Sequence, residues 1–217
     1  MRTEASSWRM TVYDVLDGAS ISAGPPRFLY ARRGPLHVAT ASGETVLDAE
    51  KGQFLCGGMR IAGNGLGWLY EVADQSRTAA CSAATPIVLS RPLPVATPGT
   101  WLLRVDRVAM PAGFVTPRHG HRGPGIRRLL SGRILAAIAD RVDRIDTGQA
   151  WFESGPEPVV GTNLHSDFTV FVRVMLLPQE LLGGQSSYLP ADADEAAKPR
   201  GVTIDVLGET LIQLGAS

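Results

Sequence analysis

Apolar and polar residues alternate in many short stretches of this sequence, which is the pattern of β-strands with one buried face. The stretch 8–16 alternates over most of its length. Residues 168–177 form the most strand-like run, because they are rich in β-branched and aromatic side chains. Further strands are predicted at 28–30, 35–40, 45–47, 68–72, 101–110, 133–140, 142–145, 151–153, 202–206 and 210–214. The pattern predicts an all-β fold built from numerous short strands.

Glycine and proline separate these strands, with 24 glycines and 15 prolines among 217 residues. The Gly-Asn-Gly sequence at 63–65 is a strong signal for a hairpin turn. One piece near the end, 192–198, is compatible with a helix. Four prolines fall within 79–99, and we place a boundary between two units there. The predicted units are residues 1–94 and 95–217.

The two predicted units repeat a similar series of strand and turn signals. The corresponding positions are Trp8 and Trp101, Gly34 and Gly132, and the Gly-Gln pairs at 52–53 and 148–149. The spacing between the last two signals differs by only a few residues between the units. This weak internal repeat predicts the same strand order twice, with different turns.

Composition excludes several classes of partner and compartment. Lysine plus arginine equals aspartate plus glutamate at 21 each, which argues against a nucleic-acid or membrane-surface partner. No stretch is apolar for long enough to predict a signal peptide or a membrane span. Only two cysteines are present, so a disulfide framework is not expected. The sequence predicts a cytoplasmic protein, and its sheets predict association as a homodimer.

Two histidines one residue apart, His119 and His121, stand out as candidate functional residues. Side chains alternate faces along a strand, so both imidazoles should point to the same side of a sheet. Turn-forming residues bracket the pair, with Gly113 and Pro117 before it and Gly-Pro-Gly at 123–125 after it. If that side is the inside of a small barrel, two imidazoles lie together in a cavity.

This stretch resembles the first sequence motif of the cupin superfamily, which is glycine, His-x-His, glutamate and glycine at set spacings. Gly113, His119, His121 and Gly132 occupy motif positions, whereas Gly125 stands where the motif has its glutamate. The resemblance implies a double-stranded β-helix, or jelly roll, and the repeat implies two such barrels in tandem. It also implies a divalent metal (Fe, Zn, Ni or Mn) in the second barrel. The first unit has no His-x-His.

Two residues are candidates for completing a metal site without the motif glutamate. His165 would be a third imidazole, which suffices for zinc or non-haem iron. The second cupin motif, however, matches only at Asn163, so His165 is expected in a turn outside the barrel. Glu153 lies in a short alternating strand and could point into the pocket, although an exposed position at a strand end is the simpler reading.

Arg127 and Trp151 are candidates for binding a substrate. If the strand continues from the histidines without a bulge, Arg127 faces the same side as they do. A buried guanidinium needs an anionic partner, either a protein carboxylate such as Glu153 or an anionic ligand. Trp151 shares a strand face with Glu153.

Three functions are compatible with these residues. The first is a metal-dependent dioxygenase or isomerase acting on a small carboxylated or phenolic molecule. The second is a non-enzymatic protein that binds or senses a small, anionic molecule without metal. The third is a fold used only for dimerisation. The fold does not choose among them.

Overall fold

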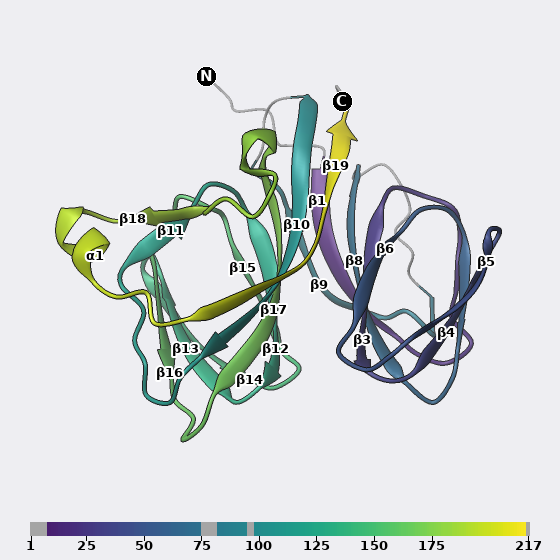
Figure 1. Cartoon of the computed structure of the whole chain (residues 1–217), viewed down its shortest axis with the longest axis horizontal. Helices are drawn as coiled ribbons and strands as arrows, with labels where there is room; N and C mark the ends of the chain where they lie inside the picture. The colour runs from purple at the N-terminus through teal and green to yellow at the C-terminus, as the bar shows by residue number, and fades with distance from the viewer. Residues whose placement is uncertain (1–7, 75–81, 95–97, 216–217) are drawn as a thin grey trace. The chain divides into compact units, whose positions relative to one another are not determined.

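The computed structural model describes residues 8–74, 82–94 and 98–215, and almost all of its regular structure is antiparallel β-sheet (Figure 1). The chain divides into two compact units, residues 1–97 together with 215–217, and residues 98–214. The all-β jelly-roll prediction is confirmed. In the described part of the chain, no helix is long and apolar enough to cross a membrane.

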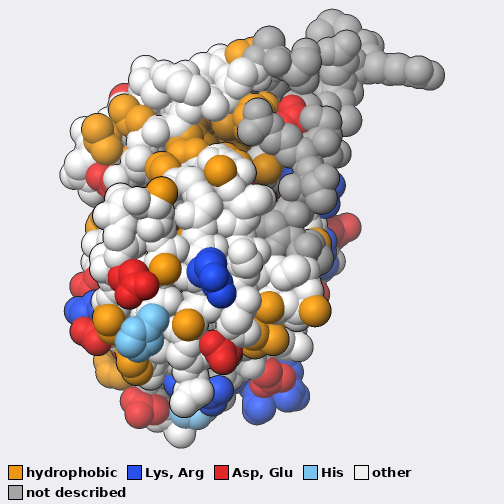
Figure 2. All heavy atoms as spheres, turned by 90° about the vertical axis from the view of Figure 1, so that its right-hand side faces the viewer, with side chains coloured by type: hydrophobic (Ala, Val, Ile, Leu, Met, Phe, Trp, Pro, Cys, Tyr) orange, Lys and Arg blue, Asp and Glu red, His pale blue; other side chains and the backbone are white. Residues whose placement is uncertain are grey.

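The first unit contains two sheets. One sheet has the strand order β6-β3-β8-β1-β9 and the other has the order β2-β7-β4-β5. On the face of this unit drawn in Figure 2, acidic and basic side chains are interspersed. The strands are β1 (Trp8–Val15), β2 (Ser20–Ile21), β3 (Arg27–Arg33), β4 (Leu36–Thr40), β5 (Gly43–Leu47), β6 (Gly52–Leu55), β7 (Met59–Ala62), β8 (Leu66–Asp74) and β9 (Ile87–Pro92).

The second unit also contains two sheets, in the orders β15-β12-β17-β10-β19 and β14-β13-β16-β11-β18. Its helical segments are η1 (Gln179–Leu181), a 3₁₀ turn, and α1 (Ala193–Ala197). Its strands are β10 (Gly99–Met110), β11 (His119–His121), β12 (Gly125–Ser131), β13 (Arg133–Ile138), β14 (Arg141–Asp146), β15 (Ala150–Glu153), β16 (Val159–Asn163), β17 (Thr169–Pro178), β18 (Tyr188–Pro190) and β19 (Thr203–Leu214).

The two units repeat one strand order, as the turn signals predict. The sheet β6-β3-β8-β1-β9 corresponds strand for strand to β15-β12-β17-β10-β19. Gly34 and Gly132 occupy equivalent turns, between β3 and β4 and between β12 and β13. Gly132 has a φ of +86°, and a Cβ there would overlap the Thr169 side chain. Glycine is therefore required at this turn by both its backbone angle and its close neighbour.

Several boundaries differ from the sequence prediction. The segments 202–206 and 210–214 belong to one strand, β19, because a bulge opposite Val105 and Asp106 absorbs an extra residue. Strand β9 lies inside the segment 79–99, in which the boundary between the two units was predicted, and β16 and β18 carry no clear strand signal. The histidines and Arg127 are not on one strand, because the chain turns at 122–124 and enters the facing sheet.

Candidate functional site

The second unit encloses a cavity of about 310 Å³ between its two sheets and the segment that follows β17. Five of the residues predicted from the sequence line it, from three different strands. The apolar part of the lining includes Val108, Ile134, Ala136, Val159 and Phe171. Its predicted polar members are His119, His121, Arg127, Trp151 and Glu153. A cavity of this size suits a small organic molecule.

The histidines reach the cavity from β11, a short strand that pairs with β16 on one side and β18 on the other. Their ring centroids lie 5.0 Å apart, with the rings nearly perpendicular. His119 Nδ1 lies 2.7 Å from the Pro117 carbonyl oxygen, so Nδ1 donates and Nε2 keeps its lone pair. His121 is 4 % exposed, and its Nε2 lies 3.5 Å from Glu153 Oε2.

Burial keeps both histidines neutral. It lowers the pKa of His119, and it lowers the pKa of His121 to well below the usual value. For His121 the nearby positive charges of Arg127 and Arg173 lower the pKa further. Two uncharged imidazoles therefore face the cavity at neutral pH, as hydrogen-bonding groups or as ligands.

Arg127 is paired with a carboxylate inside the protein, which was one of the two alternatives predicted for it. Its Nη2 lies 2.6 Å from Glu153 Oε2, and its Nη1 donates to the Gly125 carbonyl at 2.7 Å. Glu153 Oε1 accepts a hydrogen bond from Trp151 Nε1 at 2.9 Å. Burial lowers the pKa of Arg127 to about 10, so the guanidinium stays charged at neutral pH.

A second buried ion pair, missed at the sequence level, lies beside the first. Arg173 is directly opposite Arg127 on β17, and Asp106 is opposite Arg173 on β10. Arg173 Nε and Nη2 both donate to Asp106 Oδ2, at 3.1 and 2.7 Å. For Arg173 the available signal was a lone charged residue in the otherwise apolar strand β17, whereas Asp106 stands among other charged residues in β10.

The first unit has apolar side chains where the second has this pair of arginines. In its matching sheet Leu29 is opposite Leu69, and Leu69 is opposite Tyr13. All three belong to one buried apolar cluster. The first unit has its own buried ion pair, Arg27 with Glu71, on the next row of the same sheet face. The difference between the two barrels at this row is therefore that apolar packing in the first is replaced by charged side chains facing the cavity in the second.

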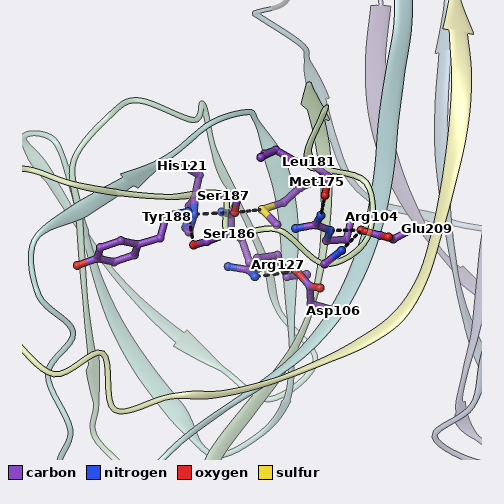
Figure 3. A network of polar contacts seen from close by, with 12 residues as sticks. Arg104, Asp106, His121, Arg127, Met175, Leu181, Ser186, Ser187, Tyr188 and Glu209 are labelled. Atoms are coloured by element: carbon purple, nitrogen blue, oxygen red, sulfur yellow. Dashed lines mark hydrogen bonds and ion pairs between the residues drawn. The ribbon is translucent and has the colours of Figure 1, made fainter. Parts of the chain in front are cut away.

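Arg104 fastens the segment after β17 to the inside of the barrel (Figure 3). Its Nε lies 2.6 Å from Glu209 Oε1 on β19, and its Nη1 donates to the Gln185 carbonyl at 2.6 Å. Its Nη2 donates to the Leu181 carbonyl. These contacts hold residues 184–188 as one wall of the cavity.

His165 is not part of this site. It lies in the turn after β16 and is not among the residues that line the cavity. Its backbone N–H donates to Asn163 Oδ1 at 2.8 Å, and its Nδ1 accepts from the Asp167 N–H at 3.3 Å. The spacing of the second cupin motif predicted that His165 lies in a turn, and its position agrees with that prediction. From this turn His165 does not line the cavity, so it is not placed to act as a third imidazole ligand.

The donor set does not fit a metal held by three protein ligands. Among the described residues no group of three histidine, cysteine or carboxylate side chains is arranged to hold one ion. Glu153, the candidate to replace the motif glutamate, already contacts Trp151 and the positive charge of Arg127. A metal ion next to that guanidinium would be repelled by it.

Comparison with known proteins identifies the fold. No protein-family model and no curated protein sequence matches the chain. Solved structures do match it. They include AerE from Microcystis aeruginosa (11 % identity, TM-score 0.57, 79 % of this chain and 88 % of that one). An oxalate decarboxylase–formate complex from Lactobacillus farciminis matches with 10 % identity and TM-score 0.60, over 89 % of this chain and 82 % of that one.

A third match is a cupin 2 conserved barrel domain protein from Leptotrichia buccalis, with 8 % identity and TM-score 0.52. It covers 80 % of this chain and 85 % of that one. The fold is the cupin jelly roll. In this cupin fold the motif positions Gly113, His119, His121 and Gly132 carry the features that the resemblance implied, a strand with two histidines and a tight turn.

Proposed function

We propose that the second cupin barrel binds a small organic anion, with its negative group at Arg127 and Arg173 and its apolar part against the opposite walls. The observation that carries this proposal is the cross-strand pair of arginines facing the cavity. Like charges directly opposite each other in a sheet are unfavourable, and the charge of Arg173 contributes to the lowered pKa of Arg127. A bound anion offsets this repulsion.

Each guanidinium retains donors for such a ligand. Glu153 and the Gly125 carbonyl contact two nitrogens of Arg127, and Asp106 accepts from two nitrogens of Arg173. A guanidinium has five N–H groups, and its planar fork matches a carboxylate. The complex of a cupin-fold neighbour with formate, a small carboxylate, supports the same ligand class.

Titration calorimetry with butanoate, hexanoate and octanoate tests the proposal, with hexanol and hexylammonium as neutral and positive counterparts. We expect at least one carboxylate to bind, and hexylammonium not to bind, because the arginines repel it. Ala136→Phe, which fills the cavity from β13, should abolish binding. Ala137→Phe on the same strand, at a half-buried position facing away from the cavity, is the matched control. Equal binding of hexanoate and hexylammonium would contradict the proposal.

A divalent metal held by His119 and His121, with water or ligand completing its coordination, is the second candidate. The observation in its favour is that both imidazoles are neutral and adjacent, since neutral imidazole is the form that ligates metals. A structure of the Bacillus subtilis oxalate decarboxylase concerns its Mn(II) centres, which supports testing manganese first.

Metal per chain should then depend on both strand histidines. We expect His119→Ala or His121→Ala to remove most of the metal, because each supplies one of only two protein ligands. His165→Ala should leave the metal content unchanged, as its turn lies apart from the cavity. Loss of metal in His165→Ala equal to that in His119→Ala would restore the three-histidine site.

A further inference from the structure

The segment between β18 and β19 brings a fourth arginine to the cavity, after Arg104, Arg127 and Arg173. Strand β18 pairs in register with β11, so that Tyr188 is opposite His121 and Pro190 is opposite His119. The Tyr188 ring also stacks on the His119 ring, with centroids 4.9 Å apart and planes 19° apart. The segment is therefore anchored to the strand that carries the histidines, and its later residues return across the cavity.

Arg200 lies over this stack. Its guanidinium carbon is 4.3 Å from the centre of the Tyr188 ring, and its Nη1 donates to Ser186 Oγ at 3.2 Å. Arg200 is exposed, yet it lines the cavity together with Ser186 and Tyr188. The aromatic face orients the guanidinium without neutralising it.

The charge of Arg200 has no carboxylate partner among the described residues. Arg104, Arg127 and Arg173, the other arginines of the lining, each contact an acidic side chain. Glu195, an acidic residue five positions before Arg200, has other partners. It is engaged by Lys198 Nζ at 2.6 Å and by the Arg118 N–H at 2.9 Å. A positive charge therefore remains available at this end of the cavity.

Apolar side chains line the cavity together with these arginines. Val202 continues the chain beyond Arg200 and lines the cavity, and Val108, Ile134 and Phe171 line its interior. The lining thus combines the arginine pair of the β12–β17 sheet, apolar side chains, and, on the segment after α1, one cation without a carboxylate partner among the described residues. Such an arrangement matches a molecule that is charged at both ends and apolar between them.

We propose that the ligand is a dicarboxylate with a short apolar body, and that Arg200 is the residue that selects it over a monocarboxylate. This inference rests on the proposed function, in which Arg127 and Arg173 hold the first carboxylate. Arg200 holds the second one. Because the Arg200 side chain is exposed, its replacement changes the selection without removing a group from the core.

The test compares succinate, glutarate, adipate and suberate with their monomethyl esters, which have nearly the same length and one charge fewer. We expect the best dicarboxylate to bind at least about tenfold more tightly than its monoester, the value of one charged hydrogen bond. Arg200→Gln should remove this difference and leave the affinity for the monoester within about threefold. Arg200→Lys should retain part of the difference, and Arg200→Glu should reverse it.

The matched control is Arg122→Gln, which removes one positive charge from the residue next to His121. Arg122 is half exposed, pairs with Glu180 and does not line the cavity, so the preference should persist in this variant. Equal affinity of wild type for diacid and monoester would overturn the inference and leave the proposed function standing. Equal weakening of both by Arg200→Gln would also overturn it, since Arg200 would then hold the only carboxylate. Binding of neither class would overturn both proposals.

Discussion

The stability of the second barrel depends on the carboxylate of Glu153, because that side chain is the counter-charge of the buried Arg127 guanidinium. The side chains of Arg127 and Glu153 are 1 % and 6 % exposed. Removing one member of such a pair leaves the other charge uncompensated in a low-dielectric environment, which costs far more than the pair itself contributes. Glu153 also accepts from Trp151, so one side chain satisfies two buried donors.

We expect Glu153→Gln to lower the free energy of unfolding by about 3 kcal/mol, because it leaves Arg127 without a counter-charge. Glu180→Gln is the control, since Glu180 pairs with Arg122 at the surface and such pairs contribute at most about 1 kcal/mol. Urea unfolding of both variants measures the difference. A loss in Glu153→Gln no larger than in Glu180→Gln would show that this pair does not support the fold.

The two cavity histidines also predict a dependence of stability on pH. Their folded-state pKa values are lowered, by burial first and then, for His121, by Arg127, Arg173 and His119. Glu153 and the Pro117 carbonyl act in the opposite direction on His119. Below the unfolded pKa of about 6.5 the unfolded chain takes up protons that the folded chain does not, so acidification favours unfolding.

Stability should therefore fall as the pH is lowered from 7 toward 5, by up to about 1.4 kcal/mol per pH unit for each histidine. Unfolding free energies measured at several pH values test this. His121→Gln should reduce the slope, whereas His37→Gln, at an exposed position of β4, should leave it unchanged. A slope in His121→Gln equal to that of wild type would refute the assignment to His121.

At the scale of the elements, two turns with glycine at the same backbone angle differ in whether a side chain there would have a close neighbour. Gly132, between β12 and β13, and Gly148, between β14 and β15, have φ of +86° and +88°. A Cβ at Gly148 would meet open space, whereas a Cβ at Gly132 would overlap Thr169. The same backbone angle thus occurs with and without a close neighbour, and of these two glycines Gly132 alone combines both constraints.

Gly148→Ala should cost about 1 kcal/mol, the strain of a side chain at positive φ. Gly132→Ala should cost clearly more, because Thr169, whose Oγ1 donates to the Arg133 carbonyl at the start of β13, must move. Thermal unfolding of both variants measures the two costs. Equal losses would mean that Thr169 moves away from the added Cβ at no measurable cost, and that only the backbone angle requires glycine at position 132.

At the scale of the whole molecule, one strand order is used twice, and one row of cross-strand neighbours is apolar in the first unit and charged in the second. The row Leu29–Leu69–Tyr13 of the first unit corresponds to Arg127–Arg173–Asp106 of the second. Apolar side chains at these positions pack a core, whereas buried ion pairs at best offset their own desolvation. This row therefore contributes less stability in the second barrel than in the first. Binding of the proposed ligand accounts for the charged residues at these positions.

Replacing the Asp106–Arg173 pair by leucines should therefore keep or raise stability while removing function. We expect the double variant to be at least as stable as wild type, and Arg173→Leu alone to lose about 3 kcal/mol through the unpaired Asp106. Both should bind hexanoate at least about tenfold more weakly. Urea unfolding and calorimetry on the three proteins give the comparison. If the stable double variant bound hexanoate as tightly as wild type, Arg173 would not contribute to binding.

The all-β fold, the repeated unit and the cavity-facing histidines were all predictable from the sequence. These features depend on period-two alternation and on glycine and proline at turns, which are local properties. Gly34 and Gly132 mark equivalent turns for this reason. The inward side of Arg127 did not follow from this alternation, because the strand that was expected to continue from the histidines ends at His121 and Arg127 lies in the facing sheet.

Only the tertiary structure decided which residues from distant strands join the site. Alternation tells which face a side chain takes and not which side chain it meets, because partners are set by pairings between strands far apart in the chain. Asp106, Arg173 and Arg200 join the cavity through β10, β17 and the segment after α1, and His165 is left out by its turn. The sequence alone determined the barrel and its two imidazoles, and long-range strand pairing determined that their neighbours are charged.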